Sequence, residues 1–348
     1  MIATKPNRLA GRGTSRGPAP GRGRRLLSAA LFAPTVIMVG IFVYGFIAFT
    51  IRVSLTRGYT PLNADMTLAE GLGDNYAALM ATPRFQMDLR NILLLTAFSL
   101  FFAITLGMVL ALLVFHCGRG SGFFRSVFLL PYALSFVVTG VVWRWIFTPQ
   151  AGVNLLLKNS GISGLYERLT GEPLQPDWIT STETIGNLSA VLERLFPQVG
   201  GWLHVQLGVP MALLPVVFAA SWQLSGFAMA LFLAGMGGIP DEVYEAARVD
   251  GAGGWRMFWN ITLPMLKGSL VVCVVLLAHV VLKCFDLVYA MVGTGPGFAT
   301  DVPAIFVYDQ MFRALKYNTG AAASIVMLVL VAAVFVPYLI RSYGKQAS

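Results

Sequence analysis

Long apolar stretches separated by polar segments form the main pattern of the chain. Each has about the 20 residues that a helix needs to cross the hydrocarbon core of a bilayer. Because a backbone in lipid must satisfy its own hydrogen bonds, we expect each stretch to be a helix. The stretches are residues 26–50, 91–115, 126–147, 211–236, 269–292 and 320–340. The pattern therefore predicts an all-α membrane protein with six transmembrane helices.

The composition agrees with this prediction. The 348 residues are 56% hydrophobic and only 12% charged, whereas about a quarter of the residues of a soluble domain are charged. The basic and then apolar N-terminus resembles a secretory signal, but its apolar part is too long and no clear cleavage site follows. We therefore expect this apolar part to be the first membrane span. Residues 1–25, rich in Gly, Pro and Arg, are expected to form a disordered cytoplasmic tail beside lipid headgroups, with nucleic-acid binding less favoured.

The Lys and Arg residues set the expected orientation. They are denser in the segments that lie inside when the N-terminus is cytoplasmic, so the positive-inside rule places both termini in the cytoplasm. The segment 238–266 then becomes a cytoplasmic loop, and 342–348 a cytoplasmic tail. The longest outer loop is 148–210, in which 187-NLSAVLERLF-196 is expected to form a short helix.

No catalytic or metal-binding pattern stands out. The three histidines lie in separate regions, and neither H-E-x-x-H nor a G-x-x-x-x-G-K-[ST] phosphate loop occurs. The three cysteines have no metal-ligand spacing. We therefore expect no cofactor in this chain, and a membrane-embedded enzyme is disfavoured. If the protein pumps with ATP, the ATPase is another polypeptide.

Ionisable residues occur within the predicted fifth span. His279, Lys283 and Asp286 are spaced i, i+4 and i+7, which places them on one face of a continuous helix. Charged groups inside a membrane are costly and usually face a bundle interior or a wet cavity. Either the stripe lines a polar pathway, or Lys283 and Asp286 form a structural ion pair with His279 in the core.

The predicted fourth span contains polar residues in its middle. Gln223 is the candidate for a substrate pathway, whereas Ser221 and Ser225 are expected to hold helices together. Prolines within spans are expected to kink or break them. These prolines are Pro34, Pro131 and Pro215.

The stretch 245-EAARVDGAGGWRMFWNITLP-264 lies in the cytoplasmic loop. Pro240 suits the first turn of a helix, and Asp241 and Glu242 suit its positive end. The helix is expected to run through Asp250 and to stop at Gly251, which favours the left-handed cap conformation.

A second short helix is expected after this cap. Trp255, Phe258 and Trp259 are spaced i, i+3 and i+4, so they share one face suited to the headgroup boundary. Together the two helices form either a docking element for a soluble partner or a simple interfacial connector.

This stretch resembles the EAA loop of binding-protein-dependent ABC importer permeases, with the pattern EAA-x3-G-x9-I-x-L-P. The fixed positions are Glu245, Ala246, Ala247, Gly251, Ile261, Leu263 and Pro264. Other segments resemble the sugar-permease branch, the relatives of the maltose and glycerol-phosphate permeases. They are 73-GDNYAAL-79, 83-PRF-85 with Asn91, 129-LLPYALSFVVTGVVWRWIF-147 and 285-FDLVYAMVGTGPGFAT-300. The resemblance covers roughly residues 27–341.

The resemblance implies a partnership in the bacterial inner membrane. Two permease subunits, identical or different, form the pore, and two cytoplasmic ATPases, which use ATP and Mg²⁺, receive the EAA loops. An extracytoplasmic binding protein delivers a sugar. Glu245 through Gly251, Asp250 included, map onto the docking helix. In the family, spans four and five contact sugar near the midplane, which corresponds here to Leu224, Phe227, Leu277, Val280 and Val281.

Two alternatives remain beside a sugar importer. One is a permease for another polar solute, such as a glycerol-phosphate or a polyol. The other is a self-contained ion-coupled carrier that uses His279, Lys283 and Asp286. The apolar character of the family's sugar-contact positions in this chain leaves room for polar groups from a partner permease.

Overall fold

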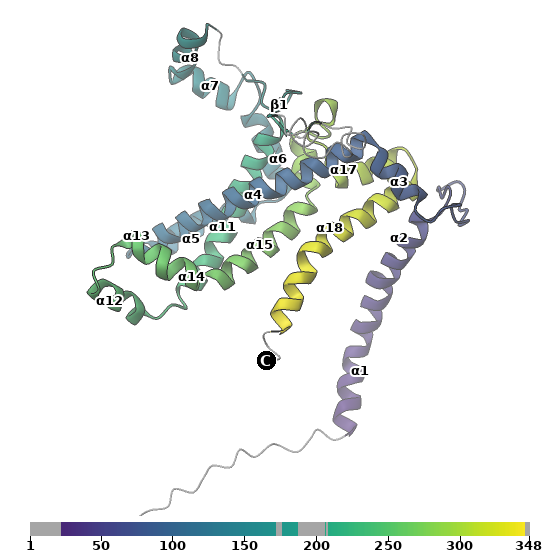
Figure 1. The fold of residues 1–348 in the computed structure, drawn as a ribbon, viewed down its shortest axis with the longest axis horizontal. Coiled ribbons are helices and arrows are strands. Elements are labelled where there is room, and N and C mark those ends of the chain that lie inside the picture. Colours follow the sequence, from purple (N-terminus) through teal and green to yellow (C-terminus); the bar gives the residue numbers. More distant parts are fainter. Residues whose placement is uncertain (1–21, 172–175, 187–205, 207, 345–348) are drawn as a thin grey trace, which may run out of the picture. The chain divides into compact units, whose positions relative to one another are not determined.

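The computed structural model describes residues 22–171, 176–186, 206 and 208–344, which are mostly helical (Figure 1). The first 21 residues of the predicted tail, the predicted helix at 187–196 and residues 345–348 lie outside the described part. The chain divides into two compact units, residues 1–49 and 50–348. Each unit is considered by itself.

The described part of the first unit is one helical run. It consists of α1 (Arg22–Val39), the π-helix η1 (Gly40–Gly45) and the start of α2 (Phe46–Ser54). The run begins before the predicted start at residue 26, so the end of the predicted disordered tail is helical. Pro34 lies within α1 and does not end it. Residues Ala30–Ser54 are long and apolar enough to cross a membrane.

Close packing of α4 (Pro83–His116) against α11 (Leu213–Met236) forms the centre of the second unit. A glycine allows this approach, because a Cβ added at Gly107 would lie 2.8 Å from the carbonyl oxygen of Ser225. Small residues at helix crossings serve the same purpose throughout membrane proteins. Leu95 and Met229, both 0% exposed, belong to the resulting core.

The predicted third span is not a straight helix. It consists of α5 (Ser121–Ala133) and α6 (Phe136–Ile146), which meet at 93°. Pro131 lies in the last turn of α5, as expected for a span broken by proline, and the Ser135 side chain caps α6 by accepting from the Val138 amide. The same prediction is wrong for Pro215, which lies in the first turn of α11, where its missing N–H costs nothing.

The predicted fifth span is also interrupted. A leading segment of α13 (Gly254–Met257), π-helix η2 (Phe258–Thr262) and α14 (Leu263–Met265) meets α15 (Lys267–Leu282) at 66°. Helix α15 then ends, and α16 (Asp286–Met291) begins after a break. The single helix predicted over residues 269–292 is therefore wrong, because it is broken between Leu282 and Asp286.

Shorter elements complete the second unit. Helix α3 (Asp74–Ala81) precedes α4, α7 (Gly152–Asn159) and α8 (Ile162–Thr170) follow α6, and α12 (Asp241–Val249) follows α11. Strands β1 (Thr184–Ile185) and β2 (Val209–Pro210) pair antiparallel. The 3-10 helix η3 (Pro296–Phe298), α17 (Pro303–Tyr308) and π-helix η4 (Asp309–Arg313) lead to α18 (Tyr317–Gly344).

Several of these helices are long and apolar enough to cross a membrane. In the described residues there are four such helices, or up to six if each bent pair counts as one span. In Figure 1 the end of the second unit that carries α12 lies opposite the end that carries α3 and α17. The predicted all-α membrane architecture is confirmed at this level.

Candidate coupling site and substrate pathway

Helix α12 follows the sequence prediction closely. It runs from Asp241 to Val249, with acidic residues in its first turn, and Pro240 lies at its N-cap. Gly251 has a φ of +77°, and the Ala252 amide donates to the Ala247 carbonyl at 2.9 Å. A left-handed glycine thus ends the helix.

The residues of the EAA pattern divide between exposed and buried positions. Glu245 and Ala246 are exposed, whereas Ala247 is buried. Val249, an apolar residue near the end of α12, is 87% exposed. One side of α12 is therefore free of contacts with the described part of this chain and presents both a carboxylate and apolar surface.

Tyr244 connects α12 to the neighbouring helices. Its hydroxyl lies 3.3 Å from the hydroxyl of Thr262, a buried residue at the end of η2. Its ring lies 6.4 Å from the ring of Phe115 in the last turn of α4. Tyr244 therefore links α12 to the end of α4 and to the segment that leads into α15.

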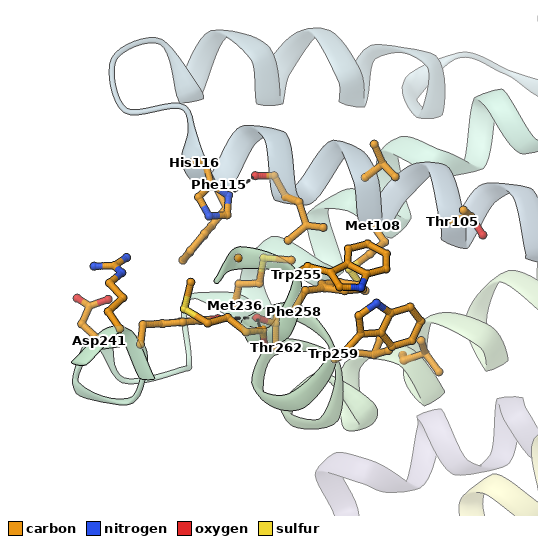
Figure 2. Close-up of a pocket in the computed structure, with 18 of the residues that line it drawn as sticks. Thr105, Met108, Phe115, His116, Met236, Asp241, Trp255, Phe258, Trp259 and Thr262 are labelled. Carbon is orange, nitrogen blue, oxygen red and sulfur yellow. Dashed lines mark hydrogen bonds between the residues drawn. The ribbon is translucent and has the colours of Figure 1, made fainter. Parts of the chain in front are cut away.

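A cavity of about 830 Å³ lies beside α12 (Figure 2). One face of α12, at i, i+3, i+4 and i+7, lines it with Asp241, Tyr244, Glu245 and Arg248. The opposite wall comes from α4 and includes Met108, Phe115 and His116. On this side α12 therefore borders open space instead of a packed core.

The predicted aromatic group forms the third wall of this cavity. Trp255, Phe258 and Trp259 contact one another, with ring centroids 5.3 to 6.2 Å apart. Figure 2 shows the three rings gathered on one short helical segment, so their predicted shared face is confirmed. Trp255 is 75% exposed within the chain. The remaining positions of the EAA pattern, half-buried Ile261 and Leu263 and exposed Pro264, lie at the bend that precedes α15.

The apolar positions proposed for sugar contact lie mainly in the core. Leu224, Leu277 and Val281 are at most 2% exposed and belong to one cluster between α11 and α15. Val280 and Phe227 are half-buried. The Phe227 ring stacks on Tyr132, with centroids 4.9 Å apart. The structure therefore packs Leu224, Leu277 and Val281 together in the core.

The polar residues of α11 have different contacts from those predicted. The Ser221 and Ser225 hydroxyls donate to carbonyls of their own helix, at 2.6 and 2.8 Å, so the prediction that they join helices is wrong. Gln223 is the residue that reaches across, and its Nε2 donates to the Leu134 carbonyl at 2.8 Å. That carbonyl lies at the break between α5 and α6. The Gln223 Oε1 atom is buried without a hydrogen-bond partner in the described part of the chain.

The predicted charged stripe of span five is wrong as a continuous helical face. Because α15 ends at Leu282, Asp286 begins a separate helix. The Lys283 Nζ atom lies 2.6 Å from His279 Nε2. No ion pair between Lys283 and Asp286 occurs in the part of the chain that the structure describes.

An ion-pair cluster at the other end of the unit was missed by sequence reasoning. Arg84 donates to Asp301 at 2.7 Å and to Asp309 at 2.6 Å, and its guanidinium lies 4.5 Å from the centre of the Phe298 ring. Burial raises the pKa of the Asp301 carboxyl, while the hydrogen bond and charge of Arg84 act in the opposite direction. Asn91 adds a bond to the Asp301 carbonyl at 2.9 Å. The resemblance drew attention to 83-PRF-85 and Asn91, but no sequence signal identified their partners.

Comparison with known proteins agrees with this architecture. Residues 103–344 match the family described as binding-protein-dependent transport system inner membrane component. A probable ABC transporter permease of Pyrococcus horikoshii is 32% identical over 90% of this chain and 94% of its own length. The xylose/arabinose import permease XacH of Haloferax volcanii is 30% identical over 91% of this chain and 88% of its own length.

A solved structure shares the fold. The bacterial alginate ABC transporter, solved in complex with an alginate pentasaccharide-bound periplasmic protein, contains a chain that matches with a TM-score of 0.67 at 20% identity. The match covers 93% of this chain and 96% of that one. The chain thus belongs to the binding-protein-dependent transport system inner membrane components, the permease subunits of ABC transporters, and is a transport component rather than an enzyme.

Proposed function

We propose that this chain is the permease subunit of an ATP-driven importer for a sugar or oligosaccharide in the bacterial inner membrane. The main support is the exposed α12, which ends at Gly251 and, together with the segment that follows it to Pro264, carries the full EAA pattern. The relative named for xylose and arabinose import supports a sugar as the substrate.

In this proposal α12 faces the cytoplasm and docks on a separate ATPase. Glu245 and Ala246 lie on its free side, and Asp250 and Gly251 end the helix, so these residues form the docking surface. ATP and Mg²⁺ are used by two ATPase subunits. Their closure moves α12, and Tyr244 passes this movement to Thr262 and Phe115.

The substrate passes between this chain and a second permease subunit. Leu224, Leu277 and Val281 are buried, so they contact sugar only after α11 and α15 shift. The partly exposed Phe227 and Val280 and the His279–Lys283 pair are the accessible candidates in the described residues. The Oε1 atom of Gln223 is buried, so it becomes a candidate only after the same shift. An extracytoplasmic binding protein delivers the sugar from the side opposite α12.

The test is reconstitution with an ATPase, a second permease and a binding protein of the same transporter. Gly251→Pro cannot adopt a φ of +77°, and Glu245→Arg reverses the charge of the docking face. We expect both variants to insert in the membrane but to lose ATPase co-purification and sugar uptake. Normal uptake by both variants would contradict the proposal, and gradient-driven flux through this chain alone would favour an ion-coupled carrier.

A further inference from the structure

The helical hairpin formed by α7 and α8 leaves the bundle at the end of α6 (Figure 1). The chain turns at Gly152, where φ is +52° and a Cβ would collide with the Ile146 carbonyl. Asn154 donates to the carbonyls of Pro149 and Pro176 at 3.0 and 3.1 Å. The base of the hairpin is therefore fixed directly against the end of a membrane helix.

The hairpin carries an apolar face that nothing in the described part of the chain covers. On α8 the face has the spacing i, i+3, i+4 and i+7, and α7 carries two exposed leucines. Its residues are exposed by 41 to 78%: Leu155, Leu156, Ile162, Leu165, Tyr166 and Leu169. Exposed apolar surface of this kind marks an interaction site. Glu167 and Arg168 occupy other positions around α8.

The location of the hairpin base limits what covers this face. Trp143, near the end of α6, contacts Phe218 near the start of α11, with ring centroids 5.0 Å apart, so α6 ends on the side of the bundle opposite α12. Val141 and Trp145 on α6 are 56 and 69% exposed. Trp gathers where a membrane helix meets the headgroups. A bilayer that covers this surface of α6 therefore reaches the base of the hairpin.

We infer that α7 and α8 lie on the bilayer surface, with this apolar face in the boundary between lipid headgroups and acyl chains. Short amphipathic helices bind membranes in this way, Tyr166 suits the interface, and Lys158 and Arg168 suit anionic headgroups. A soluble binding protein fits the face less well, because leucine is under-represented among the residues that dominate protein–protein affinity. The inference requires membrane insertion but no particular substrate.

Site-directed spin labelling of the assembled transporter in lipid nanodiscs tests the inference. Cys117 and Cys284 are replaced by serine, and the buried Cys273 is retained. Labels are placed at Leu165→Cys and, as the matched control on the same helix, at Glu167→Cys. We expect label 165 to collide several-fold more with lipid-soluble oxygen, relative to a water-soluble nickel chelate, than label 167 does.

Each other outcome overturns the inference. Equal access of both labels to the nickel chelate would place the hairpin in water. A label at 165 that is shielded from both reagents would show that protein covers the face. Shielding that appears only when the binding protein is added would assign the face to that protein. A variant with neither introduced cysteine is treated with the spin label in the same way. Its signal gives the residual labelling of Cys273.

Discussion

Arg84 at the start of α4 donates its Nε–H to the Asp301 carboxylate at 2.7 Å, although the two residues are 217 positions apart. The Asp301 side chain is 0% exposed, and the same guanidinium also pairs with Asp309. This contact ties the start of α4 to the segment that joins η3 and α17.

Replacing Arg84 by methionine is expected to destabilise the protein by roughly 3–5 kcal/mol, because it leaves a buried carboxylate without its partner. Thermal unfolding in detergent measures the effect. The control is Arg57→Met, whose partner Glu70 is 4.0 Å away and 89% exposed. That change should leave the midpoint unaltered. Equal midpoints for the two variants would show that the buried cluster contributes nothing to stability.

Gly107→Val is expected to separate α4 from α11. Its Cβ would lie 2.5 Å from the Ala228 Cβ and 2.8 Å from the Ser225 oxygen, and overpacking of this kind costs about 1–3 kcal/mol or more. We expect a lower unfolding temperature and less monodisperse protein on size-exclusion chromatography. Gly122→Ala on α5 has open space around its added Cβ and serves as the control. Unchanged stability of the valine variant would refute the close crossing.

Tyr244→Phe removes the hydroxyl that contacts Thr262 but keeps the ring beside Phe115. If this contact carries movement from α12 to α15, the amount of sugar transported per ATP hydrolysed falls several-fold while the ATPase still co-purifies. Tyr166→Phe on α8 makes the same chemical change far from α12. The role of the Tyr244 hydroxyl is disproved if both variants keep the wild-type ratio of transport to hydrolysis.

Gln223→Leu leaves the Leu134 carbonyl without its donor at the break between α5 and α6. A hydrogen bond of this kind contributes about 0.5–1.5 kcal/mol, so the unfolding temperature should fall even without substrate. A residue that only binds sugar would behave differently, with a raised KM for transport and normal stability. Measuring both quantities on the same variant separates the two roles. Ser221→Ala, which removes a bond within one helix, is the matched control.

Local chemistry made several features predictable. The apolar stretches marked the membrane helices, because a span needs only enough consecutive apolar residues. The ends of α12 followed from Pro240, Asp241 and Gly251, since capping depends on neighbouring residues. The spacing of Trp255, Phe258 and Trp259 predicted that their rings lie together, because residues at i, i+3 and i+4 share one face of a helix.

The breaks within the membrane spans were harder to predict from the sequence. No local sequence signal required α15 to end at Leu282. The predicted stripe of His279, Lys283 and Asp286 assumed a helix that continues to Asp286, and α15 does not. The Leu134 carbonyl, which is left without a helical partner at the break after α5, accepts a hydrogen bond from Gln223 on α11, 89 positions along the chain. Helices can break in this way only because tertiary partners satisfy the exposed backbone groups.

The sequence by itself determined the membrane class, the approximate positions of the long apolar segments and the EAA loop, because these depend on the hydrophobicity and spacing of residues close together in the chain. Only the tertiary structure decided that Arg84 pairs with Asp301, that Gly107 lies against Ser225 and that α12 borders a cavity. Such contacts join residues more than a hundred positions apart. Their energy depends on how the helices pack, which no local pattern specifies.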